Sequence, residues 1–87
     1  MAQGRFRSAP TNHFLRELKK LPADVKARVL LAIEELVSNP FAGIRLRGEL
    51  DGLFRWRTGD YRIVYKIDEE KRLVVLLDVG PRKAIYG

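Results

Sequence analysis

The two stretches YRIVYKID (residues 61–68) and RLVVLLDVG (residues 72–80) decide the fold. The first alternates, which is typical of a strand with one buried face. That face carries Tyr61, Ile63, Tyr65 and Ile67. The second has an unbroken Val/Leu run, which is typical of a central strand buried on both faces. Residues 68–71 form a short turn-rich connection between them, so the two strands are expected to pair antiparallel.

The same pattern extends towards the N-terminus. Residues 53–57 (LFRWR) alternate and are joined to residue 61 by the turn Thr58-Gly59-Asp60, which completes an antiparallel meander of three strands. Residues 4–9 (GRFRSA) also alternate and predict a weak edge strand that Pro10 ends.

Two amphipathic helices are expected between these strands. Thr11 is a suitable N-cap for a helix over residues 12–20, and Leu21-Pro22 ends that helix. A second helix is expected from Pro22 to about Ser38, where Asn39-Pro40 stops it. The predicted fold is therefore α+β with the order β-α-α-β-β-β. A two-helix hairpin packs on one face of a small twisted antiparallel sheet, in a single domain spanning residues 1–87.

Composition excludes several classes of protein. The 87 residues contain no cysteine and one histidine, so disulfide frameworks, thiolate nucleophiles and Cys- or His-rich metal sites are ruled out, and no metal or other cofactor is expected. No apolar run reaches the length of a membrane span, and residues 1–10 lack the apolar core of a secretion signal. We therefore expect a cytoplasmic protein without a membrane partner. The net charge of +6 favours a polyanionic partner, although a basic domain can also be merely solvated.

The cations concentrate on the predicted sheet. Arg55 and Arg57 are two residues apart and share one face, while Phe54 and Trp56 point to the other. Arg62 is expected on the arginine side of the next strand. A guanidinium matches a phosphate bidentately and stays charged at any cellular pH. The alternative is a solvated face, in which these arginines pair with carboxylates of Asp60, Asp68, Asp78 or Glu69.

The C-terminal residues GPRKAIYG place Arg82 and Lys83 close to Tyr86. An exposed tyrosine can stack on a nucleobase while neighbouring cations hold the phosphates. The alternative role for Tyr86 is to anchor the C-terminus at the edge of the core.

Four motifs together carry a family resemblance. They are LKKLP (residues 18–22), NPxxGxxLxG (39–48), GDYRIVY (59–65) and VGxRK (79–83). In this order and spacing the chain resembles, over almost its whole length, the RelE toxins of the RelE/ParE superfamily of type II toxin–antitoxin systems. The resemblance implies the same helical hairpin on a sheet and a cognate antitoxin as partner.

The resemblance also implies an activity, namely cleavage of mRNA in the ribosomal A site without a metal, which would arrest translation. The partners are then the ribosome, its rRNA and mRNA. The 2′-hydroxyl attacks the adjacent phosphorus and leaves a 2′,3′-cyclic phosphate and a 5′-hydroxyl. By position, Arg62 is expected to hold the scissile phosphate, Arg82 to stabilise the phosphorane and Tyr86 to orient the base. Arg55, Arg57 and Lys83 are expected to bind the RNA backbone.

Two departures from the family leave the general base open. Arg55 and Arg57 stand where some RelE proteins carry lysines, and arginine does not lose its proton at cellular pH. Pro81 stands where relatives often have a histidine or another basic residue. Two alternatives to the ribonuclease remain: a non-enzymatic DNA gyrase inhibitor resembling ParE, and an inactive antitoxin-binding protein of the same fold.

Overall fold

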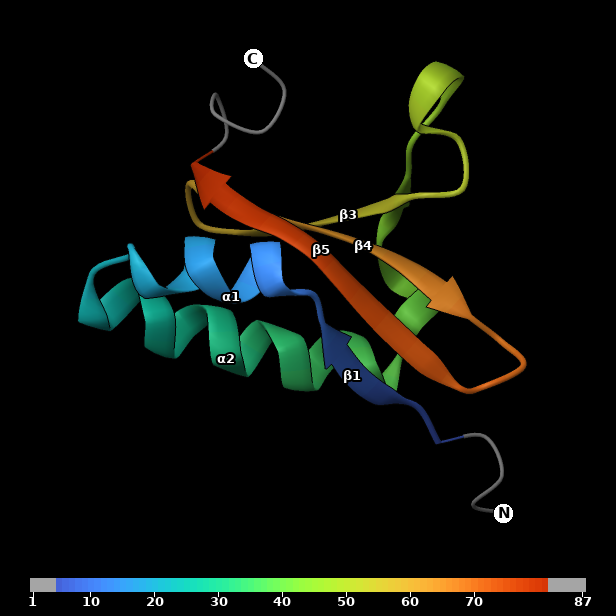
Figure 1. The fold of residues 1–87 in the computed structure, drawn as a ribbon, viewed down its shortest axis with the longest axis horizontal. Helices are drawn as coiled ribbons and strands as arrows, with labels where there is room; N and C mark the ends of the chain where they lie inside the picture. The colour runs from blue at the N-terminus through green and yellow to red at the C-terminus, as the bar shows by residue number, and fades with distance from the viewer. Residues whose placement is uncertain (1–4, 82–87) are drawn as a thin grey trace.

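The computed structural model describes residues 5–81, which form two helices and one sheet (Figure 1). The helices are α1 (Asn12–Lys19) and α2 (Ala23–Ser38), and two 3₁₀ turns follow at η2 (Pro40–Ala42) and η3 (Gly48–Leu50). The strands are β1 (Arg7–Pro10), β2 (Ile44–Arg45), β3 (Phe54–Thr58), β4 (Tyr61–Asp68) and β5 (Leu73–Pro81). The predicted α+β class and the predicted helical hairpin are confirmed.

The sheet has the strand order β1-β5-β4-β3-β2. The predicted meander is confirmed, because β3, β4 and β5 pair antiparallel in sequence order. The prediction of an entirely antiparallel sheet is wrong, since β1 runs parallel to β5. A parallel pair needs a long crossover, and the chain between β1 and β5 provides it. The two-residue strand β2, which pairs with Arg55 and Phe54, was not predicted from the sequence.

The start of α1 is fixed to β5. The predicted cap is confirmed, because the Thr11 hydroxyl accepts a hydrogen bond from the Phe14 amide at 3.1 Å. The same hydroxyl donates to the Leu76 carbonyl at 3.0 Å, and the Thr11 amide donates to that carbonyl too. The parallel pairing of β1 therefore ends where the helix begins, and α1 starts directly beside the middle of β5.

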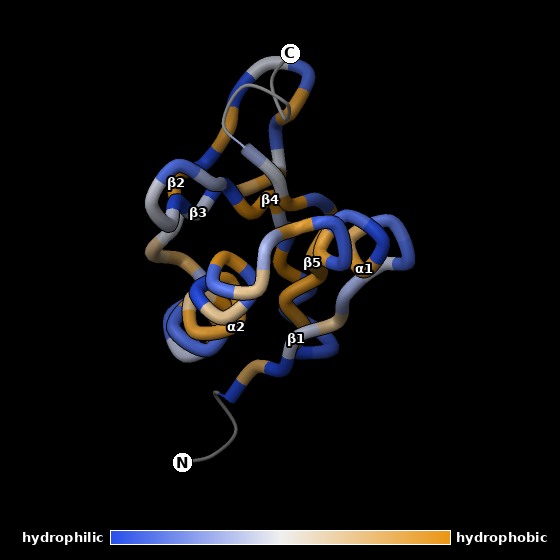
Figure 2. Tube along the Cα trace, turned by 90° about the vertical axis from the view of Figure 1, so that its left-hand side faces the viewer, coloured by the Kyte–Doolittle hydropathy of each residue, from blue (hydrophilic) through white to orange (hydrophobic). Residues whose placement is uncertain are grey.

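The hydrophobic core lies between the helices and one face of the sheet. Figure 2 shows long hydrophobic stretches along β5, close to the two helices. The buried core members of the helices and of the interior strands are Phe14, Val25, Val29, Ala32, Leu36, Phe54, Ile63, Tyr65, Val74, Leu76 and Val79. The prediction that this strand is buried on both faces is confirmed for this face of β5 and is wrong for the other, where Leu73, Val75 and Leu77 are only partly buried.

Tyr65 is the largest fully buried side chain of this core. Its hydroxyl donates to the Pro40 carbonyl at 2.8 Å, and burial raises the pKa of this phenol to about 12. Gly43 lies so close that a Cβ there would collide with the Tyr65 hydroxyl. Tyr65 therefore ties the segment after α2 to the sheet and stays protonated at neutral pH.

Candidate functional site

The face of the sheet opposite the helices carries three arginines in two cross-strand rows. In the first row, Arg57 lies directly opposite Arg62, which lies opposite Gly80. In the second row, Arg55 lies opposite Val64, which lies opposite Asp78. Side chains in neighbouring rows on one face are within reach of each other. We refer to Arg55, Arg57 and Arg62 as the arginine face.

The exposure of the three arginines differs. Arg57 is exposed and Arg55 is half-buried, but Arg62 is only 8% exposed. The sequence placed Arg62 on the correct side of β4, but the burial of its side chain does not agree with the alternative of a solvated face. β4 has a full neighbouring strand on each side, whereas β3 is flanked on its outer side only by the two-residue β2. A cation on the middle strand is therefore covered more than one on β3.

The positive charge of Arg55 and Arg57 is not compensated within the described part of the chain. Neither guanidinium forms an ion pair with a carboxylate of residues 5–81. Like charges directly opposite each other on two strands destabilise a sheet, and Arg57 faces Arg62 in this way. In addition, Arg55 Nε is buried and finds no hydrogen-bond acceptor among residues 5–81. An oxyanion bound on this face would reduce the repulsion between Arg57 and Arg62 and would accept a hydrogen bond from Arg55 Nε.

The ion pairs expected of a solvated face are not formed by Arg55 and Arg57 within residues 5–81, whereas the exposure of Arg57 agrees with that alternative. Two of the carboxylates proposed as partners make other contacts. Asp78 Oδ1 is 3.1 Å from His13 Nε2, and Asp68 Oδ1 accepts from the Lys71 amide at 3.1 Å.

The contact between His13 and Asp78 was missed by the sequence analysis. The two residues are 65 positions apart, and only the docking of α1 on β5 brings them together. No local pattern in the sequence reports that docking. The contact joins the single histidine of the chain, on α1, to Asp78 of β5.

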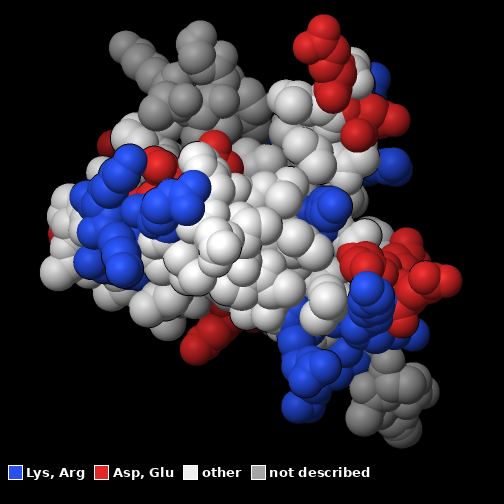
Figure 3. Space-filling view, viewed as in Figure 1, with Lys and Arg blue, Asp and Glu red and all other residues white. Residues whose placement is uncertain are grey.

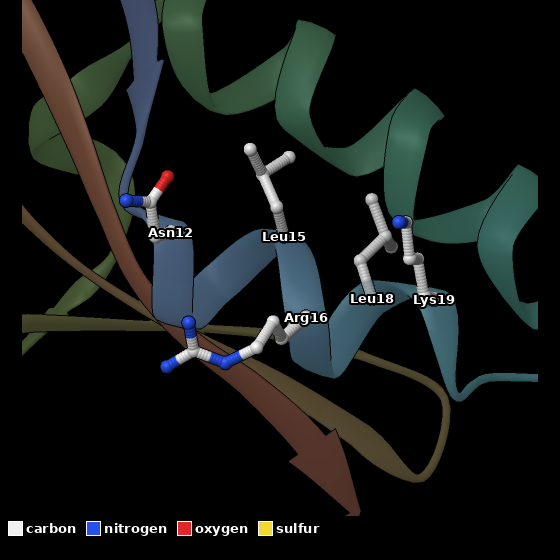
Figure 4. Close-up of a pocket in the computed structure, with 5 residues that line it drawn as sticks. All are labelled: Asn12, Leu15, Arg16, Leu18 and Lys19. Carbon is white, nitrogen blue, oxygen red and sulfur yellow. The ribbon is translucent and has the colours of Figure 1, made fainter.

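A second surface lies on the helical hairpin. A groove of about 390 Å³ is lined by Asn12, Leu15, Arg16, Leu18 and Lys19. Figure 4 shows Leu15 and Leu18 extending from α1 towards α2, with Arg16 on the opposite side. Leu15 is 42% exposed. Figure 3 shows Lys and Arg gathered at the end of the molecule where α1 leads into α2. The groove thus combines an apolar floor with a cationic surrounding.

Three predicted site residues, Arg82, Lys83 and Tyr86, lie outside the described residues. Among residues 5–81 no group of three or more His, Asp or Glu side chains is arranged to hold a metal ion. Nor does any helix in this range have the length and apolar character needed to cross a membrane.

The fold and the arginine face define a small basic α+β protein with a surface suited to a polyanion. The sequence profile of the ParE-like toxins of type II bacterial toxin–antitoxin systems matches residues 9–87. The chain therefore belongs to this toxin family, which confirms the resemblance to the RelE/ParE superfamily.

Individual relatives agree with this assignment. The chain is 44% identical to toxin RelG of Mycobacterium tuberculosis over 73 residues, which cover 82% of this chain and 84% of RelG. It is 38% identical to toxin RelE of the same organism over 73 residues, covering 82% and 75% of the two chains. Its fold matches a chain of the M. tuberculosis toxin–antitoxin complex RelBE2 with a TM-score of 0.84 and 38% identity, covering 90% of this chain and 99% of that one.

Proposed function

We propose that this toxin is a metal-independent endoribonuclease that cleaves mRNA in the ribosomal A site and thereby inhibits translation. The observation that carries the proposal is the gathering of guanidinium groups on this face, where Arg57 lies directly opposite Arg62 and where Arg55 and Arg57 form no ion pair with a carboxylate of residues 5–81. Such a surface is costly to the free protein and gains most from binding phosphate groups.

The proposed chemistry needs charge stabilisation more than a metal. As the 2′-oxygen attacks phosphorus, negative charge develops on the phosphorane oxygens, and preorganised cations stabilise it. Arg62 lies on the middle strand, and its guanidinium is suited to fix the scissile phosphate. By their place in the sequence, Arg82 supports the phosphorane and Tyr86 stacks on the base. Arg55, Arg57 and Lys83 hold the flanking backbone.

A gyrase inhibitor remains the second candidate, because the matching family profile is named after ParE. Such an inhibitor would bind a protein and would need no phosphate-binding set. The complete set Arg62, Arg82 and Tyr86 in this chain favours the ribonuclease.

The two functions are separated by one experiment. The purified chain is added to ribosomes programmed with an mRNA of defined A-site codon, and the 3′ ends of the RNA are mapped. In parallel, supercoiling by DNA gyrase is measured at the same toxin concentrations. Cleavage within the A-site codon, with a cyclic phosphate end and unaffected gyrase, supports the proposal. Inhibited supercoiling with intact mRNA contradicts it and supports the second candidate.

We also propose an antitoxin as the protein partner. The similar toxin chain of M. tuberculosis was solved as part of a toxin–antitoxin complex. In this chain, the groove on α1 offers an apolar floor with cations around it, and the arginine face offers further positive charge. Both features favour an acidic segment that carries leucine-type side chains, laid over the helical hairpin and the arginine face.

Two variants test which surface the antitoxin covers. Leu15→Asp puts a carboxylate on the floor of the groove, while the triple change of Arg55, Arg57 and Arg62 to Glu reverses the arginine face. If both surfaces are covered, each variant weakens the complex in titration calorimetry. Unchanged affinity of the triple variant would leave the helices as the sole docking surface, and unchanged affinity of Leu15→Asp would exclude the groove.

A further inference from the structure

A pocket outside the arginine face lies where the segment after α2 meets the sheet. Its volume is about 430 Å³, and its lining comes from η2, β2, β3, β4 and the connections beside them. The lining residues are Phe41, Arg45, Gly52, Phe54, Ile67 and Glu69. Phe54 and Arg55 are consecutive on β3, so their side chains, and with them the pocket and the arginine face, lie on opposite sides of one strand.

The pocket contains an aromatic ring that is open to a ligand. Phe41 is 53% exposed, although its ring lies edge-on to two others. The ring centroids are 6.4 Å apart for Phe6 and Phe41 and 6.2 Å apart for Phe41 and Phe54. Unstacked nucleobases bind proteins by stacking on exposed aromatic rings of this kind.

A guanidinium lies on either side of Phe41 along this row of rings. Arg45 lies over the Phe54 ring, 6.0 Å from its centroid, and Arg72 lies over the Phe6 ring at 5.5 Å. Neither arginine forms an ion pair with a carboxylate in the described part of the chain. An exposed ring between two such cations is typical of surfaces that bind single-stranded nucleic acid, because the ring stacks on a base while the cations bind phosphates.

A carboxylate gives the pocket a means of selecting the base. Glu69 lies in the connection between β4 and β5, and its carboxylate makes no ion pair or hydrogen bond among residues 5–81. A carboxylate only accepts hydrogen bonds, so it pairs with the exocyclic amine of cytosine and not with the carbonyl of uracil. An apolar protein side chain in the pocket would cover Arg45 and Glu69 without offering either a partner, which is unfavourable.

We propose that this pocket binds an amine-bearing base of the mRNA strand whose phosphates lie on the arginine face. The inference rests on the proposed ribonuclease function, because mRNA is the ligand. The base stacks on Phe41, its amine donates to Glu69, and Arg45 binds the adjacent phosphate. Only the two-residue β2 lies outside β3, so a strand that leaves Arg55 reaches the pocket around this edge of the sheet. The pocket thereby reads a nucleotide that flanks the cleaved codon.

Paired oligonucleotides test the pocket directly. The purified chain is titrated with fluorescent single-stranded RNA made only of cytidine or only of uridine, at equal length and charge, and binding is followed by anisotropy. The wild type should bind the cytidine strand about tenfold more tightly. Glu69→Ala should abolish this preference. Glu70→Ala removes the neighbouring exposed carboxylate, which does not line the pocket, and should keep the preference.

A second pair of variants tests the stacking. Phe41→Ala should weaken the binding of both strands by about 5- to 150-fold, because one stacked base is lost. Leu30→Ala removes an apolar side chain of equal exposure on α2 and should weaken neither.

Programmed ribosomes show whether the base belongs to mRNA. Messages that carry either C or U at the nucleotides flanking the A-site codon are cleaved under single-turnover conditions. The message with cytosine should be cleaved faster by the wild type and by Glu70→Ala, whereas Glu69→Ala should cleave both messages at the same rate.

The failures of the inference differ from a failure of the proposed function. A cytidine preference that survives in Glu69→Ala overturns the inference, and so does a wild-type chain that binds both strands or cleaves both messages equally. A Phe41→Ala variant that binds RNA like the wild type but loses affinity for an antitoxin in titration calorimetry also overturns it, because the pocket then takes a protein side chain. Cleavage within the A-site codon would still support the ribonuclease in each case. A wild-type chain that leaves A-site mRNA intact overturns the proposed function and the inference together.

Discussion

Replacing Arg57 by Gln should make the protein more stable and less active at the same time. Arg57 is exposed, forms no ion pair within residues 5–81, and lies directly opposite Arg62. Removing one of two like charges that face each other across a sheet relieves about 0.2–1 kcal/mol. For a domain of this size, 1 kcal/mol corresponds to about 4–8 °C in Tm, so the melting temperature should rise by about 1–8 °C.

The same change should weaken catalysis. A hydrogen bond to a charged group contributes about 1.5–3 kcal/mol, so losing one phosphate contact should lower single-turnover cleavage about 10- to 100-fold. The assays are thermal unfolding followed by circular dichroism and cleavage on programmed ribosomes. Raising the salt to 1 M should shrink the gain in stability, because the screening length then falls to about 3 Å.

Lys66→Gln is the matched control. Lys66 is an exposed cation on β4, and its partner on β5 is the uncharged Val75. Removing it deletes one positive charge without relieving a facing cation, so Tm should not rise. A Tm of Arg57→Gln below that of the wild type contradicts the prediction, because Arg57 then makes a stabilising contact. The prediction also fails if cleavage is unchanged, since the arginine face then does not contact the RNA.

Three further outcomes follow from the core and from the C-terminal residues. Gly43→Ala should cost about 1–3 kcal/mol in urea unfolding, because its Cβ displaces the Tyr65 hydroxyl from the Pro40 carbonyl. The pKa of Tyr65 is raised to about 12 from its ordinary value near 10, so the wild type should lose stability as pH rises from about 10 to 12, a loss that Tyr65→Phe should not show. In single-turnover cleavage, Arg82→Ala should lose about 100-fold, and Tyr86→Ala should lose the stacking of a base, worth about 1–3 kcal/mol, whereas Tyr86→Phe should retain most activity.

The elements of the fold that local chemistry determines were predictable. Thr11, Pro22 and Pro40 mark helix ends through capping and through the missing amide of proline, and the structure places the boundaries there within a residue or two. The alternation along β4 predicts its full length, because one face is buried. The parallel pairing of β1 with β5 was not predictable in this way, since no turn joins the two strands and sequence distance says nothing about direction.

The candidate site likewise has one part that the sequence predicts and another part that depends on the assembled fold. That Arg55 and Arg57 share one face follows from a period of two along β3. That Arg62 is buried depends on its having a full strand on each side, which is a property of the assembled sheet. That Asp78 contacts His13, and that Arg55 and Arg57 pair with no carboxylate of residues 5–81, depends on where α1 docks. A local sequence pattern does not report which charged side chains of distant elements pair with each other, although this pairing distinguishes a solvated face from a binding face.

Arg55, Arg57 and Arg62 therefore lower the stability of the free protein but contribute to its proposed activity. A sheet optimised for folding would not place Arg57 opposite Arg62, nor bury Arg55 Nε without an acceptor, because each arrangement raises the free energy of the native state. Apolar or acidic residues at these positions would fold more stably. Both arrangements become favourable when phosphate oxygens lie across the rows, since one bound oxyanion screens the facing cations and accepts from the buried N–H. Under the proposed ribonuclease function, an RNA backbone would relieve these unfavourable terms of the free protein on binding.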